Sequence, residues 1–184
     1  MKSTQFFKRF KKDIKDKKEY KKALFFLFLF ILFFSLFYLV FGKTPIANYI
    51  NCFYGLVSSF ILSILGISNS FVFDTATKSS TIFVSKLTEP ITLGFLCTGI
   101  LEFCLLASAI AASAGIVVKK RVFGVLLAIP IIFVFNTTRI VLTSLIILGG
   151  NLSFANFVHG LLFRLFLIIV IIGTYYFWFK ANTR

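Results

Sequence analysis

Long apolar runs alternate with short polar breaks along most of this 184-residue chain. Four of these runs approach or exceed the ~20 residues that an α-helix needs to cross a bilayer. They cover residues 23–41, 95–118, 122–148 and 157–179. A water-soluble core of this size has no room for four such helices. The pattern therefore predicts an all-α polytopic membrane protein with four transmembrane helices.

A fifth apolar run, over residues 46–66, has a polar side. Polar or small residues recur in it at spacings of three or four: Asn48, Asn51, Gly55, Ser58, Ser59 and Ser63. A helix with one polar and one apolar face can lie at the membrane surface instead of spanning it. We expect an amphipathic helix on the outer face of the membrane. The sequence leaves open the alternative of five spans with one end inverted.

The stretch that follows changes from helical to strand-like patterning. Residues 70–74 and 81–85 are short runs rich in β-branched and aromatic side chains, and the polar residues 75–80 separate them. Such a pattern is typical of a β-hairpin. We expect a small extracytoplasmic hairpin, with Pro90 just before the next helix.

Charge sets the expected orientation. The net charge is +14, and ten of the twenty Lys and Arg residues lie within residues 1–22, with further clusters at 119–121 and in the tail 180–184. Short loops rich in Lys and Arg stay in the cytoplasm. The expected domains are therefore a basic cytoplasmic segment, 1–22, and a single membrane-embedded domain, 23–184, with both termini cytoplasmic.

The basic N-terminal segment also suggests a partner. Lys and Arg next to a span are attracted to anionic lipids. Nucleic-acid binding is not expected, because the sequence has no basic groove interleaved with aromatic residues and no known reader motif.

Three chemically active side chains lie near the outer ends of three separate predicted spans. These are Cys97, Arg139 and His159, the last being the only histidine of the chain. An ionisable residue inside a span is costly, so it suggests a function. With the predicted orientation, the three side chains converge at the extracytoplasmic face. A thiol, a permanent cation and an imidazole at one depth suit acyl transfer.

Neighbouring residues are candidates to support this trio. Thr98 and Gly99 follow Cys97, and a glycine there permits close approach of another backbone or of a substrate. Asn136 lies three residues before Arg139 and so shares its helix face. No cofactor or metal is expected, because no cysteine pair or histidine cluster has the spacing of a metal site.

Structural roles are the alternatives at these positions. A buried cysteine is usually a small hydrophobic residue, which is our interpretation of Cys104 and the alternative for Cys97. Glu102 and Arg164 lie five residues after Cys97 and His159, in helices expected to run the same way. We therefore expect Glu102 and Arg164 to form a structural ion pair, and a pair between Glu102 and Arg139 is the alternative.

The ordered segments Cys97-Thr-Gly-Ile, Asn136-Thr-Thr-Arg139-Ile and His159-Gly resemble the exosortase/archaeosortase family of membrane cysteine transpeptidases. The resemblance covers about residues 46–175, and the threonine after Cys97 is more similar to the archaeal members. It implies that Cys97 is the nucleophile, Arg139 the family's conserved arginine and His159 the third catalytic position. The chain resembles a minimal core of the family, without the additional N-terminal helices.

The chemistry of the three residues agrees with this resemblance. Arg139 suits stabilisation of the thiolate and of an oxyanion, since it keeps its charge, and His159 suits proton transfer. The resemblance implies a secreted protein substrate with a C-terminal hydrophobic sorting signal. The signal would be cleaved through a Cys97 thioester, and the protein transferred to a lipid or glycan anchor.

Two other functions stay open from the sequence. One is a non-enzymatic assembly or transport subunit with a structural Arg/Glu network. The other is an intramembrane-type cysteine protease that releases its substrate to water. Catalysis requires Cys97, Arg139 and His159 to lie within reach of one another at an outer cavity, whereas transport requires a polar path that continues inward.

Overall fold

The computed structural model describes residues 2–85, 87 and 89–183, and the side chains of 19–85, 87, 89–95, 97–151, 153–155 and 157–183. It is 74% helical and contains one small three-stranded sheet. The predicted predominance of helices is therefore confirmed.

Within the part of the chain that the structure describes, four helical stretches are long and apolar enough to cross a membrane. The first is Glu19–Gly42, which comprises the second half of α1 (Lys2–Phe37) and the π-helical turn η1 (Tyr38–Gly42), and the second is α2 (Ile46–Ile64). The third is α4 (Val118–Leu148). The fourth is Ser153–Thr183, which runs through α5 (Leu152–Phe157), the π-helical turn η3 (Val158–Leu162) and α6 (Phe163–Thr183). This set differs from the predicted one, since α2 qualifies by length and composition and the helix after the sheet does not.

The predicted helix over residues 95–118 is wrong in its bounds. A short 3₁₀ turn, η2 (Phe95–Cys97), comes first, and α3 covers only Ile100–Ala112. Its 13 residues give about 20 Å of helix, less than the ~30 Å hydrocarbon core. Gly99 has φ +68° and Gly115 has φ +94°. A left-handed residue interrupts an α-helix, so these glycines limit α3 although the composition stays apolar.

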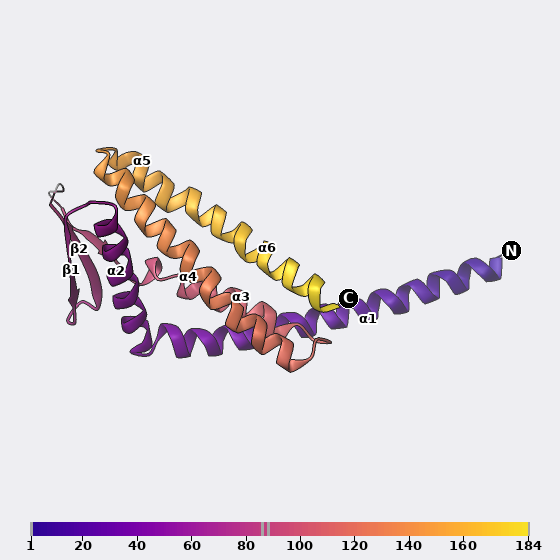
Figure 1. The fold of residues 1–184 in the computed structure, drawn as a ribbon. Helices are drawn as coiled ribbons and strands as arrows, with labels where there is room; N and C mark the ends of the chain where they lie inside the picture. The colour runs from indigo at the N-terminus through magenta and orange to yellow at the C-terminus, as the bar shows by residue number, and fades with distance from the viewer. Residues whose placement is uncertain (1, 86, 88, 184) are drawn as a thin grey trace.

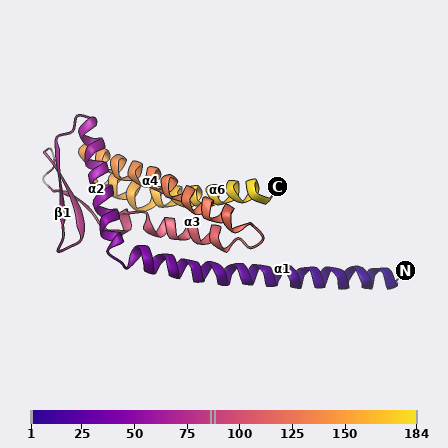
Figure 2. The same ribbon diagram turned by 60° about the horizontal axis from the view of Figure 1, so that its bottom comes forward.

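Helices α1, α3, α4 and α6 run alongside one another, and α2 crosses their ends (Figures 1 and 2). Side chains from three of them form one buried cluster, with Leu106 and Ile110 from α3, Ala128 and Ile132 from α4, and Trp178 from α6. The crossing helix α2 lies at the end away from both termini (Figure 2). The bundle therefore has two distinct ends.

The sheet lies beyond α2 at that same end (Figure 1). It contains β1 (Asn69–Asp74), β2 (Ser79–Val84) and β3 (Ile91–Leu93), all antiparallel, in the order β1-β2-β3. The predicted hairpin of β1 and β2 is confirmed. Strand β3 was not predicted, since it has only three residues and its preceding Pro90 was interpreted as the start of a helix.

The turn between β1 and β2 is held by Asp74. Its carboxylate accepts hydrogen bonds from the backbone N–H of Ala76 at 2.8 Å and from the hydroxyl of Thr77 at 2.6 Å. These two bonds favour the charged form and hold the pKa of Asp74 below its ordinary value. Asp74 thus fixes the turn that sets the register of the hairpin.

The sheet packs on the polar side of α2. A Cβ atom at Gly55 would lie 2.4 Å from the ring of Phe71, so the glycine permits this contact. The amide nitrogen of buried Asn51 donates to the carbonyls of Lys78 and Leu93, each at 3.1 Å. Part of the polar stripe that the sequence showed on α2 therefore binds the sheet instead of facing water.

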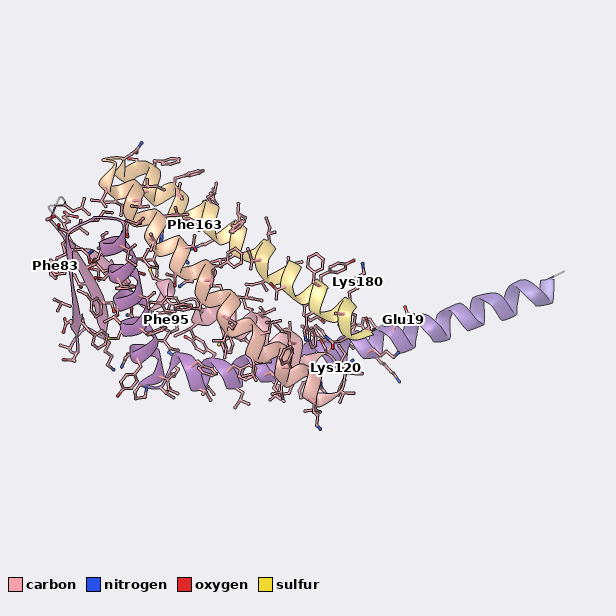
Figure 3. The ribbon with its side chains drawn as sticks, in the orientation of Figure 1. Glu19, Phe83, Phe95, Lys120, Phe163 and Lys180 are labelled. Carbon is pink, nitrogen blue, oxygen red and sulfur yellow. The ribbon has the colours of Figure 1, made fainter. Side chains whose placement is uncertain are left out.

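The basic groups gather at the other end of the bundle. Lys22 of α1, Ser113 of the turn between α3 and α4, and Tyr175 of α6 line one cavity there. Lys120 and Lys180 lie at this end, far from Phe83 on the sheet (Figure 3). The chain therefore passes from one end to the other in α1, α3, α4 and α6.

This arrangement of the two ends predicts which positions a thiol reagent can label from the same side of the membrane. In a variant without the native cysteines, single cysteines at positions 78 and 151 should be labelled by a membrane-impermeant maleimide applied to intact cells. Cysteines at 119 and 180 should react only after permeabilisation, since they lie at the basic end. Labelling of 78 and 119 from the same side would contradict the arrangement.

Candidate active site

Cys97, Arg139 and His159 lie together at the sheet end of the bundle, although they come from three elements. Cys97 ends η2, Arg139 lies in the second half of α4, and His159 lies in η3. The Sγ atom of Cys97 lies 3.9 Å from Nε2 of His159. The Nη2 atom of Arg139 lies 3.1 Å from that same nitrogen. One imidazole nitrogen thus contacts both the thiol and the guanidinium.

The backbone at Cys97 is held directly by α4. The side-chain amide of Asn136 donates a hydrogen bond to the carbonyl of Cys97. A Cβ atom at Gly99 would lie 3.0 Å from Ile132 and 3.2 Å from the Asn136 side chain. Buried Thr98 closes the same turn, with its hydroxyl donating to the Phe95 carbonyl at 2.7 Å. The close approach expected at Gly99 is therefore that of a helix, and it fixes where the thiol points.

The hydrogen bonds around His159 determine its protonation state. A guanidinium can only donate, so Nε2 must accept from Arg139. The ring proton of a neutral imidazole then belongs on Nδ1, which lies 3.4 Å from the hydroxyl oxygen of Thr143. That hydroxyl donates its own hydrogen to the Arg139 carbonyl at 2.8 Å, so it accepts from Nδ1. The network presents a basic nitrogen toward Cys97.

Arg139 carries a permanent charge into an apolar part of the molecule. It is only 2% exposed, and its Nε atom has no hydrogen-bond partner within the described residues. The buried Oδ1 atom of Asn136 also has none there. Within the described part of the chain, no carboxylate forms an ion pair with Arg139. A buried cation with free donors is an unusual and costly arrangement that suits an anionic or oxygen-rich ligand.

A cavity of about 240 Å³ lies beside the His159 ring and the Cys97 thiol. Cys97, Thr143 and His159 line it, together with Ile140 of α4 and the segment 89–93 that contains β3. The thiol is half-buried, so it is neither sealed in the core nor freely exposed. The candidate nucleophile and base therefore face a common space.

The predicted ion pair of Glu102 with Arg164 is not formed. Arg164 is exposed, Glu102 is half-buried, and in the described part of the chain no hydrogen bond or ion pair joins them. The prediction assumed equal α-helical steps from Cys97 and His159. One interval crosses the left-handed Gly99 and the other crosses the π-helical turn η3, so equal residue counts do not give equal depth.

Two parts of the site were missed at the level of sequence. Thr143 lies four residues after Arg139 on the same helix face, but nothing in this spacing indicates its contact with His159. Strand β3 gave no signal, although its residues form one wall of the cavity.

Comparison with known proteins gives no information about the chemistry of this site, which must be inferred from its own side chains. No family model, no curated protein and no solved structure matches the chain. What the geometry offers is a thiol, a neutral imidazole whose acceptor nitrogen faces it, and a buried cation beside a cavity.

The tautomer derived above predicts an effect of Thr143. Thr143→Val removes the acceptor for Nδ1–H, so the ring loses the bond that orients Nε2 toward Cys97. Alkylation of Cys97 by iodoacetamide at neutral pH should slow about fivefold to tenfold, as expected for one lost hydrogen bond. Thr143→Ser keeps the hydroxyl and should retain the rate of the unaltered protein. Equal rates for the valine and serine variants would exclude a role of Thr143 in orienting the base.

Proposed function

We propose that this protein is a membrane thiol transpeptidase of the exosortase/archaeosortase type. It cleaves a C-terminal sorting signal from secreted proteins through a Cys97 thioester and transfers them to a lipid or glycan anchor. The observation that carries this proposal is the position of His159 Nε2, 3.9 Å from the Cys97 sulfur and 3.1 Å from Arg139. The resemblance of the three motifs supplies the substrate class.

In the first step, Nε2 of His159 takes the thiol proton, and the sulfur of Cys97 attacks the scissile carbonyl carbon. The new C–S bond moves an electron pair onto the carbonyl oxygen. Arg139 must release Nε2 before that nitrogen can accept the proton, since both bonds use the same lone pair. Its N–H groups are then free for the developing oxyanion, which a fixed guanidinium stabilises in a water-poor site.

In the second step, the carbonyl re-forms, the C–N bond breaks, and the leaving amine takes the proton from His159. This leaves a thioester on Cys97. The acceptor, an amine or hydroxyl, then attacks the thioester carbonyl and gives its proton to His159. Expulsion of the sulfur forms the anchored product, and the proton returns from His159 to the thiol.

A second cavity supports a lipid acceptor over a glycan. It has a volume of about 440 Å³, and Thr98 and Gly99, the residues after Cys97, line it. The rest of its lining is apolar apart from the hydroxyl of Tyr54, and it includes Phe53, Phe103 and Phe133. Such a space suits a hydrocarbon chain, whose polar head would then lie beside the thioester.

The proposed setting is a bilayer crossed by α1, α4 and the α5–α6 segment. A further crossing runs from η2 through α3 to the turn before α4, because α3 alone is shorter than the hydrocarbon core. Helix α2 then lies at the extracytoplasmic surface, with the exposed apolar row Leu56, Phe60 and Ile64 against lipid. The basic end, with both termini, faces the cytoplasm and its anionic lipids. The site opens on the extracytoplasmic side.

The alternatives have less support. A transport subunit requires a polar path from the site to the basic end. The cluster of Leu106, Ile110, Ala128 and Ile132 instead fills that region of the described bundle with buried apolar side chains. A protease that releases its substrate shares the same first step, and it differs only in using water as the acceptor.

The nucleophile assignment predicts a selective loss of activity. Cys97→Ala should abolish removal of the sorting signal, measured by mass spectrometry of the processed substrate, while the protein stays folded. Cys104→Ala and Cys52→Ala are the matched controls and should remain active. Cys104 is buried beside Ala47 and Ile100, Cys52 lies on α2, and neither lines the cavity that Cys97 and His159 share. Processing by the Cys97→Ala variant would end the proposal.

The role of Arg139 predicts that charge alone is insufficient. Arg139→Lys keeps the cation but lacks the planar fork of donors that can serve His159 and the oxyanion in turn. The rate of acylation should fall about 10²-fold to 10³-fold, the usual effect of losing one oxyanion donor. Thermal unfolding in detergent is the control, since a folded but inactive lysine variant is the expected result. A fully active lysine variant would show that only the charge matters.

A further inference from the structure

Strand β3 is an edge strand. It pairs with β2 in the register Ser80↔Leu93, Thr81↔Thr92 and Ile82↔Ile91, and among the described residues it pairs with no other strand. An edge strand has N–H and C=O groups on its free side that are available to another extended chain. The free side of β3 is thus a potential recognition surface.

This free side borders the cavity that contains Cys97. The five consecutive residues Glu89, Pro90, Ile91, Thr92 and Leu93 all line that cavity. Successive side chains of a strand point to opposite faces of the sheet. If only one face of the strand bordered the cavity, every second residue would line it, and not consecutive residues. The backbone edge itself therefore adjoins the space that Cys97 and His159 share.

The strand is held in place without any ligand. The Asn51 amide donates to the Leu93 carbonyl at 3.1 Å, and the Leu93 side chain is buried with Ile82 and Ile140. A preformed edge does not have to be ordered when a ligand binds, which favours affinity. Cys97 follows Leu93 by only four residues, so the edge and the thiol are fixed relative to each other.

We propose that the segment to be cleaved binds as an additional β-strand along the free edge of β3, which delivers its scissile carbonyl to Cys97. This inference rests on the proposed function for its assumption that the substrate is a peptide. The edge selects an extended polypeptide because its backbone groups alternate as donors and acceptors, whereas a hydrocarbon chain has nothing to pair with them. Recognition then depends on backbone hydrogen bonds, with side chains adding selectivity at alternate positions.

The test uses the full-length protein in detergent and a peptide reagent that needs no knowledge of the natural substrate. Acetyl-tetraalanyl chloromethyl ketone alkylates a thiol as the sulfur displaces chloride, and mass spectrometry measures the rate at Cys97. Four further reagents each carry one backbone N-methyl group in place of one N–H. N-methylation at every second position should slow alkylation about fivefold to tenfold, while the intervening positions should keep the parent rate. Iodoacetamide monitors the intrinsic reactivity of the thiol.

Proline variants of the strand test the protein side. Successive N–H groups along a strand point to opposite edges, so Ile91→Pro and Thr92→Pro each remove a different one. One of the two variants should keep the iodoacetamide rate and lose the preference for the parent peptide. Val72→Ala, at an exposed position of β1 that does not line the cavity, is the control and should behave as the unaltered protein. Where a proline variant does not fold, the N-methyl series decides alone.

The outcomes separate this inference from the proposed function. Equal alkylation rates for all four N-methylated reagents, or no alkylation by the peptide reagent at all, would overturn strand addition even if Cys97→Ala abolishes processing. Alternating sensitivity would support strand addition even if Cys97→Ala leaves processing unchanged. Pairing of β3 with a second copy of this chain would block the edge. The four N-methylated reagents would then alkylate Cys97 at equal rates, which overturns the inference.

Discussion

A guanidinium that keeps its proton at any ordinary pH is buried in α4, and the candidate site is organised around it. Arg139 is 2% exposed, and His159 accepts one of its hydrogen bonds. Because arginine only donates, His159 must present a lone pair at Nε2 and carry its proton at Nδ1. Thr143 completes the chain by accepting from Nδ1. The position of one buried cation thus fixes the protonation state of the candidate base, which is the property that thiol activation needs.

The same helix also fixes the thiol. Asn136, one turn before Arg139, binds the Cys97 carbonyl, and Gly99 lets the start of α3 approach α4 closely. The left-handed conformation of Gly99 that permits this contact also shortens α3. The shortness of α3 and the position of Cys97 therefore depend on the same residue, Gly99. Helix α4 carries the cation and also holds the backbone of the nucleophile, although Cys97 itself lies in η2 and His159 in η3.

The sequence predicted those features that depend on composition and local spacing. Hydropathy located α1, α4 and α6, and the charge pattern placed the basic segments at one end of the bundle. The convergence of Cys97, Arg139 and His159 followed from the predicted orientation of the spans, which places the outer parts of all three at one membrane face. Each of these inferences needs only the number of residues and the helical rise.

Features that depend on tertiary contacts or on irregular backbone could not be predicted. The polar stripe on α2 indicated an amphipathic helix, but only the structure shows that Asn51 and Gly55 contact the sheet. The ion pair of Glu102 with Arg164 assumed regular helices, and the π-helical turn η3 and Gly99 break that regularity. Strand β3 has three residues, too few for any pattern to identify.

The central claim is that Cys97 becomes covalently acylated, and a direct measurement of the acyl-enzyme tests it. The purified protein would be incubated with its substrate in detergent that contains no lipid or glycan acceptor, and the mass of the Cys97 peptide would then be determined. The account predicts an adduct on Cys97 that corresponds to the substrate without its sorting signal and that neutral hydroxylamine releases. Processing of the substrate at its full rate, with Cys97 unmodified at every time point, would contradict it.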